Sequence, residues 1–211
     1  MPIVTISRQY ASGGGEVAEK VAARLDTILL DRELIQETAR RLGLPEDVVS
    51  EHDERGESLI SRLVSALRVS YPDASAPADI LDPGAEVLDI SSRAYVQVTE
   101  QVIQEAARSG NAVIVGRGSQ FVLRNHPHAL HVHVYAQFDF RVQSIMAERS
   151  VERKEADHIV RDFDAARARY ARHFYRADWQ SSQHYHLMID AGTLGRDLAT
   201  DLICTAVAHL P

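Results

Sequence analysis

The chain has 211 residues and a net charge of −7, which argues against general binding to nucleic acid. Its only cysteine, Cys204, excludes an intramolecular disulfide and a cysteine-rich zinc site. No apolar run approaches the roughly 20 residues of a membrane span, and the N-terminus lacks the pattern of a signal peptide, so we expect a cytoplasmic protein.

Short apolar runs that predict β-strands alternate with stretches of helical periodicity. In chain order, the expected strands are Val4–Ser7, Thr27–Leu30, Asn111–Val115, Leu130–Tyr135 and Tyr185–Ile189. The expected helices are Glu16–Leu25, Glu33–Leu42, a segment starting at Pro45, Ser58–Val69, Ala85–Arg108, Phe138–Arg149, Glu152–His173 and Leu194–His209. Residues 70–84 are rich in proline without periodicity, which predicts a loop. This order predicts an α/β fold, a parallel sheet with helices on both faces, whose ligands bind beyond the carboxyl ends of the strands.

A glycine cluster, SRQYASGGGE, lies between the first strand and the first helix. The phosphate-binding P-loop pattern is G-x-x-x-x-G-K-[ST]. Aligned on Gly13, this pattern places Arg8 at the first glycine, Gly14 at the lysine and Gly15 at the hydroxyl residue. Backbone N–H groups of Ser12–Gly15 can still form a concave anion site at a helix N-terminus. The alternative is a tight glycine turn that holds no ligand.

Charged residues give further candidates for a phosphate site. Glu16 follows the glycines, and its carboxylate either ligates Mg²⁺ or repels phosphate. From Arg141 to Arg176 there are nine basic and six acidic residues, a local charge of +3 in an acidic chain. Arginine suits bidentate contacts with phosphate, although a run of charges usually marks a solvated helix face. Four histidines, at positions 126, 128, 131 and 133, have no acidic residue or cysteine nearby, so a zinc site is the less favoured reading.

Several stretches together resemble the cytidylate kinase-like proteins, which are bacterial relatives of the nucleoside monophosphate (NMP) kinases. They are SRQYASGGGEVAEKVAARL, LLDRELIQE, AVIVGRGSQFVL, LHVHVYAQFDFRVQSIM and DFDAARARYARHFYRADW. The resemblance spans nearly the whole chain and is weakest from about Glu46 to Ala94. It implies one P-loop NMP-kinase-like domain over residues 1–211 with a five-stranded parallel sheet. It also implies a helical NMP-binding insertion over 32–110 and a lid over 149–180.

The resemblance also implies roles for individual residues. Ser12, Gly13, Gly14, Gly15 and Glu16 correspond to the loop around the donor phosphates, with Arg8 beside it. Asp31 matches an aspartate near the acceptor phosphate and the metal, and it could also cap the following helix. Arg117 in Gly116-Arg117-Gly118 matches the arginine of a GRD motif that contacts the acceptor nucleotide; a buried ion pair is the alternative. Asp164 and Arg167 match the D-x-x-R pattern of the lid, with Arg153 and Arg169 as further phosphate ligands.

The reaction implied is transfer of the γ-phosphoryl group from ATP, with Mg²⁺, to CMP, dCMP or a related acceptor. The true cytidylate kinases have lysine where this chain has Gly14. The alternative is therefore a catalytically inactive nucleotide- or anion-binding protein, acting as a sensor or partner-binding subunit. We expect a small nucleotide as the partner, and no membrane or nucleic acid. A homodimer through the long helix Ala85–Arg108 is a further possibility.

Overall fold

The computed structural model describes residues 2–31, 37–38, 40–41 and 85–210. The chain forms two compact units, one of residues 1–31 with 103–211 and the other of residues 32–102. The expected helices between Glu33 and Val69, and the expected loop at 70–84, lie mostly or wholly outside the described residues. The assignments of an NMP-binding insertion and a lid stay predictions. In the described part of the chain, no helix is both long and apolar enough to cross a membrane.

The first unit contains a five-stranded sheet whose pairings are all parallel, as predicted. The strand order is β2-β3-β1-β4-β5. The strands are β1 (Ile3–Arg8), β2 (Ile28–Leu30), β3 (Ala112–Val115), β4 (Ala129–Tyr135) and β5 (Leu187–Asp190). Because the strands are parallel, the segments that follow β1, β2 and β3 all leave the same edge of the sheet.

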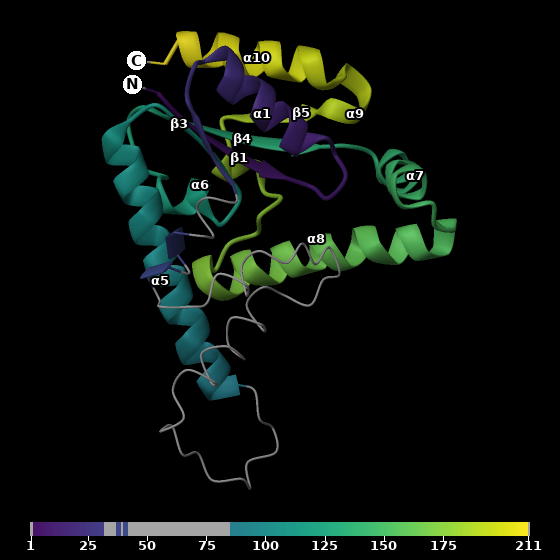
Figure 1. The fold of residues 1–211 in the computed structure, drawn as a ribbon, viewed down its shortest axis with the longest axis horizontal. Coiled ribbons are helices and arrows are strands. Elements are labelled where there is room, and N and C mark those ends of the chain that lie inside the picture. Colours follow the sequence, from purple (N-terminus) through teal and green to yellow (C-terminus); the bar gives the residue numbers. More distant parts are fainter. Residues whose placement is uncertain (1, 32–36, 39, 42–84, 211) are drawn as a thin grey trace, which may run out of the picture. The chain divides into compact units, whose positions relative to one another are not determined.

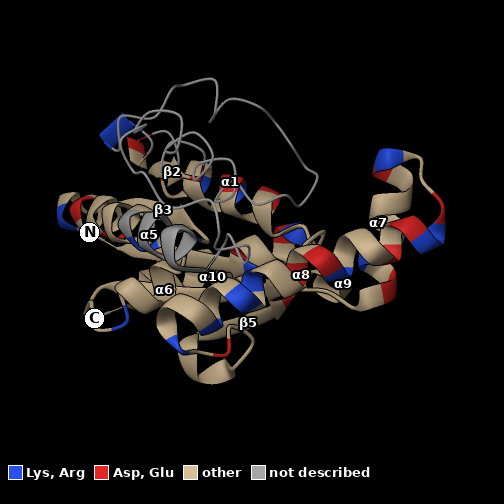
Figure 2. Cartoon of the chain, turned by 90° about the horizontal axis from the view of Figure 1, so that it is seen from below, with Lys and Arg blue, Asp and Glu red and all other residues tan. Residues whose placement is uncertain are grey.

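Helices cover both faces of this sheet (Figure 1). Helices α1 and α10 pack on one face, and α6 and α8 lie on the other (Figure 1). The described helices of the first unit are α1 (Gly14–Arg24), α6 (Ser119–Val122), α7 (Phe138–Arg149), α8 (Arg153–Tyr175), α9 (Ala191–Leu194) and α10 (Arg196–Ala208), with a 3₁₀ turn at Ser182–His184. Charged residues of both signs occur along α7 and α8 (Figure 2). Helix α5 (Ala85–Ser109) begins in the second unit, where Thr99 donates a hydrogen bond to the carbonyl oxygen of Tyr95 at 2.8 Å.

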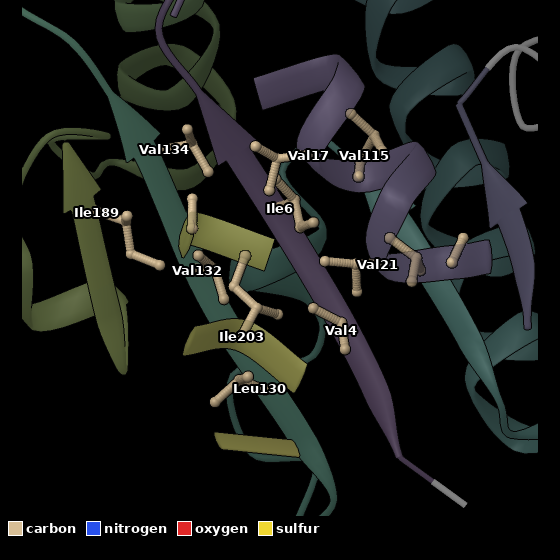
Figure 3. Packing of buried hydrophobic residues seen from close by; sticks show 14 of the residues in the cluster. Val4, Ile6, Val17, Val21, Val115, Leu130, Val132, Val134, Ile189 and Ile203 are labelled. Atoms are coloured by element: carbon tan, nitrogen blue, oxygen red, sulfur yellow. The ribbon is translucent and has the colours of Figure 1, made fainter. Parts of the chain in front are cut away.

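The apolar core fixes the strand–loop–helix junction at the N-terminus. Val4 and Ile6 of β1 pack with Val17 and Val21 of α1, and Ile203 of α10 belongs to the same cluster (Figure 3). All five side chains are buried. Alternation along β1 directs Thr5 and Ser7 to the opposite face of the sheet. The loop between β1 and α1 is therefore anchored at both ends by residues of this core cluster.

Candidate phosphate-binding site

The loop between β1 and α1 has the backbone of a tight glycine turn. Gly13 is the N-cap of α1 with φ +81°, in the left-handed region that glycine adopts without strain. The Ser12 hydroxyl is buried and donates to the carbonyl oxygens of Gln9 at 2.9 Å and Val134 at 3.2 Å. Ser12 thus stabilises the loop with its side chain. The first N–H groups of α1, at Gly14 and Gly15, have no acceptor within the helix and are the donors that an anion would use.

Arg8 occupies the space beside Gly14. A Cβ atom added to Gly14 would lie 2.6 Å from Cβ and 3.4 Å from Cγ of Arg8. A Cβ added to Gly116, after β3, would lie 2.8 Å from Arg8 Nη1, and Arg8 Nη2 is 3.4 Å from Oδ2 of Asp31, after β2. The Arg8 side chain therefore crosses Gly14 and brings a guanidinium to the shared edge of three neighbouring strands.

Three arginines influence one another at this edge of the sheet. Burial lowers the pKa of Arg8; the Asp31 carboxylate opposes that shift and the charge of Arg117 adds to it. Burial also lowers the pKa of Arg167 to about 9, and Arg8 and Arg117 contribute in the same direction. Like charges so placed are stabilised by an anion between them, which makes Arg8, Arg117 and Arg167 a candidate phosphate-binding cluster. We refer to these three residues as the arginine cluster.

Arg117 is presented by an unusual turn after β3. Gly116, Arg117 and Gly118 all have positive φ, of 69°, 55° and 72°. The left-handed conformation costs about 1–2 kcal/mol for a residue with a Cβ, and such strain often marks functional positions. A Cβ on Gly118 would lie 2.3 Å from the ring of Tyr175. The aspartate of the GRD motif does not fit at Gly118 while that ring is in place.

Asp164 fastens α8 to the glycine loop. Its Oδ1 accepts the backbone N–H of Tyr10 at 3.0 Å, and its Oδ2 accepts Nη1 of Arg141 at 2.5 Å. Arg141 is buried and also donates to the carbonyl oxygens of Tyr10 and Ala136. Both carboxylate oxygens of Asp164 thus hold the loop in shape, a structural role that sequence reasoning had not assigned to it.

Two further contacts join the loop to α8. The Tyr10 ring stacks on Phe163 with 4.0 Å between ring centroids and 5° between planes. Arg167 donates from Nη1 to the carbonyl oxygen of Arg8 at 2.6 Å, and its guanidinium carbon is 5.6 Å from the centroid of the Tyr10 ring. The Arg167 guanidinium is therefore held at the loop by a hydrogen bond to the loop backbone and by a cation–π contact with the Tyr10 ring. Tyr10 and Arg141 were not among the predicted site residues.

Three predicted site residues have surroundings other than the arginine cluster. Arg153 pairs with Asp139 at 2.5 Å and precedes Arg167 by 14 positions, about 21 Å along an α-helix. Arg169 is exposed and points about 200° around α8 from Arg167. Glu16 is exposed and pairs with Arg196, with 3.1 Å between Oε2 and Nη1. Their predicted roles toward phosphate or metal stay untested.

Asp31, the acidic residue at this edge of the sheet, suits Mg²⁺ that phosphate and water also bind. It suits a metal ion bound by the protein alone less well. Among the described residues, no group of three or more histidine, cysteine, aspartate or glutamate side chains could hold a metal ion. Mg²⁺ needs only one or two carboxylates when phosphate oxygens and water complete its shell. Asp31 is partly exposed beside Arg8 and fits that requirement.

Two of the histidines considered for zinc are core residues in this structure. His131 and His133 are buried on β4, and their Nδ1 atoms are hydrogen-bonded to the hydroxyls of Thr5 at 2.8 Å and Ser7 at 3.2 Å. Burial lowers the pKa of each to about 4. Both rings are therefore neutral at pH 7 and pack against the face of the sheet opposite α1.

Comparison with known proteins places the chain in a family. The pattern of the cytidylate kinase-like family matches residues 3–193. Solved structures that resemble it include an uncharacterized protein from Eubacterium ventriosum (TM-score 0.70, 20% identity, 99% of each chain covered). They also include shikimate kinase from Bacteroides thetaiotaomicron (TM-score 0.53, 11% identity, 98% of each chain covered). No curated protein matches in sequence. The chain belongs to the cytidylate kinase-like family and has the fold of the P-loop kinases.

Proposed function

We propose that this member of the cytidylate kinase-like family transfers the γ-phosphoryl group of Mg-ATP to CMP, dCMP or a related nucleoside monophosphate. The observation that carries the proposal is the position of Arg8. In the P-loop pattern, position 8 is glycine and position 14 is lysine. Here position 8 is arginine and position 14 is glycine, and the Arg8 side chain lies against Gly14. Arg8 would thus supply the missing cation from the other end of the loop.

The proposed arrangement assigns the donor phosphates to the glycine loop. The N–H groups of Gly13, Gly14 and Gly15 would bind phosphate oxygens at the N-terminus of α1. Arg8 would neutralise the phosphates nearest the reacting bond, as the P-loop lysine does elsewhere. Asp31 would supply a carboxylate oxygen to Mg²⁺, the ion that neutralises the developing charge in such reactions.

Arg117 and Arg167 would act on the acceptor side and on the transferred group. Phosphoryl transfer depends on positioning and on fixed positive charge, because its transition state spreads negative charge over the transferred oxygens. Arg117 follows β3 and would hold the acceptor phosphate. Arg167, anchored on the carbonyl of Arg8, would face the transferred group from α8. Three arginines that influence one another beside the glycine loop favour catalysis over a binding protein that has lost its charge.

The test is release of ADP from Mg-ATP in the presence of CMP, dCMP, UMP, AMP or no acceptor. We expect turnover that depends on the acceptor and falls about 10²–10³-fold in Arg8→Met, the effect of removing one electrostatic contact to a transition state. Arg24→Met is the matched control, since Arg24 forms an exposed ion pair with Asp201 at the far end of α1. Nucleotide binding without acceptor-dependent turnover would identify an inactive binding protein instead. Turnover unaffected by Arg8→Met would refute the role of Arg8.

A further inference from the structure

Arg196 is the first residue of α10, and its side chain lies on the glycine loop. A Cβ added to Gly13 would lie 2.8 Å from Nε, 3.3 Å from Cγ and 3.5 Å from Cδ of Arg196. Its Nη1 is 3.1 Å from Oε2 of Glu16, the third residue of α1. The guanidinium is therefore beside the first turn of α1, where the loop N–H groups would bind an anion. Residue 196 did not stand out in the sequence, because it is separated from the loop by 180 positions.

The ion pair of Arg196 differs from its two neighbours. Helices α1 and α10 are joined by three exposed ion pairs, Glu16–Arg196, Lys20–Asp197 and Arg24–Asp201. The last two bridge the helices on their outer faces. Arg196, unlike a residue engaged in its ion pair alone, also lies against Gly13 of the glycine loop. The first pair thus has a position from which it can meet a ligand.

The ion pair between Glu16 and Arg196 is weak enough for a bound polyphosphate to replace Glu16 as the partner of Arg196. The two side chains are 54% and 44% exposed, and an ion pair in water of that kind is weakly held. A polyphosphate offers several charges and planar oxygen pairs that a guanidinium binds bidentately. Glu16 carries a negative charge next to the same helix N-terminus, so it competes with the anion. Binding of polyphosphate therefore favours release of Arg196 from Glu16.

We propose that Arg196 is a further phosphate-binding residue of the glycine loop, and that Glu16 holds it in place until a polyphosphate takes its guanidinium. Glu16 acts as a positioning residue and as a competitor for the anion. The inference rests on the proposed function only in taking the glycine loop as a polyphosphate site. It adds a cation from α10 to those that the arginine cluster supplies from β1, β3 and α8.

The test is calorimetric titration of the full chain with inorganic tripolyphosphate in the absence of metal. Arg196→Gln should weaken binding about tenfold or more, the usual effect of losing a hydrogen bond between charged groups. Glu16→Gln should strengthen binding severalfold, because it removes the competing carboxylate. The gain from Glu16→Gln should shrink in the Arg196→Gln background to the part due to lost repulsion between the carboxylate and the anion, since no guanidinium is then left to release.

Lys20→Met is the matched control, because it breaks the neighbouring ion pair of the same two helices without touching the loop. Equal losses in Lys20→Met and Arg196→Gln would show that α10 merely supports the loop, and would overturn the inference. So would a gain from Glu16→Gln that is equally large with and without Arg196. Loss of binding in Arg8→Met but not in Arg196→Gln would reject this inference and leave the proposed function standing. Absence of tripolyphosphate binding by the natural chain would also overturn this inference, whereas the proposed function is tested separately by turnover with Mg-ATP.

Discussion

The effects of substitutions at positions 8 and 14 should depend on each other, because a side chain added at Gly14 would need the space that Arg8 occupies. A Cβ on Gly14 lies 2.6 Å from Arg8 Cβ and 3.3 Å from Val134 Cβ. Carbon atoms prefer separations of about 3.5–4.0 Å. The shorter contact joins two atoms next to the backbone, which no rotation of a side chain can separate. Gly14→Ala should therefore strain the loop in the natural chain.

The expected cost follows from the known effect of overpacking. An extra methyl group in a well-packed site costs about 1–3 kcal/mol, and we expect Gly14→Ala to destabilise the chain by that amount. In an Arg8→Gly background the 2.6 Å contact is gone. There, Gly14→Ala should be close to neutral, because alanine also favours the helical backbone over glycine by roughly 0.5–1 kcal/mol. The two substitutions should thus show a coupling free energy of at least about 1 kcal/mol.

Urea unfolding of the four variants in this cycle measures the coupling directly. A second experiment uses the double exchange Arg8→Gly with Gly14→Lys, which rebuilds the pattern G-x-x-x-x-G-K in residues 8–14. We expect the exchange to retain tripolyphosphate binding that Arg8→Gly alone loses. Equal costs of Gly14→Ala in both backgrounds would show that the positions do not share space. Loss of tripolyphosphate binding in the exchange variant would refute the idea that Arg8 replaces the loop lysine.

Two predictions concern pH. The pKa of Arg167 is lowered to about 9, well below the usual range of arginine. Tripolyphosphate binding should therefore weaken as the pH rises through about 9. Titration at pH 7.5 to 10 tests this, and Arg167→Gln should bind tripolyphosphate weakly, with a flatter pH profile. Buried His131 and His133, each with a pKa of about 4, take up protons more readily when unfolded. Stability should thus fall as the pH drops from 6.5 toward 4, by at most about 3 kcal/mol per histidine. Urea unfolding at pH 7, 5 and 4 measures this loss of stability. If the free energy of unfolding depends on pH as steeply in His131→Gln/His133→Gln as in the natural chain, the loss does not come from these two rings.

The fold was predictable because apolar runs and helical periodicity are local features of the sequence that recur along the chain. Each of the five strands is an apolar run with a clear end, and the observed strands begin or end within two residues of the expected ones. Helices α7 and α8 were found by periodicity alone. The helices α6 and α9, of four residues each, are too short to show a period. Their starts depend on Gly118 and Asp190, residues that turns of many kinds also use.

The candidate site was predictable in composition but not in geometry. Topology brings Asp31 and Arg117 to one edge of the sheet, as parallel strands require. The path of Arg8 across Gly14 depends on side-chain packing, and nothing in the local pattern indicates it. The attachment of Tyr10 to Asp164 and Arg141 joins positions more than 130 residues apart. Such contacts follow from the folded structure and leave no periodic trace in the sequence.

Moving the cation from position 14 to position 8 has a consequence for the order of binding. A lysine on α1 would reach the phosphates from the helix itself, whereas in the proposed arrangement Arg8 would reach them from its ion pair with Asp31. Asp31 is also the carboxylate that would bind Mg²⁺, so metal and Arg8 compete for it. ATP alone can take Arg8 only by breaking its ion pair with Asp31, and Mg²⁺ alone can take Asp31 only by breaking the same ion pair. Mg-ATP satisfies both at once, and we therefore expect metal and nucleotide to bind with positive coupling that Asp31→Asn removes.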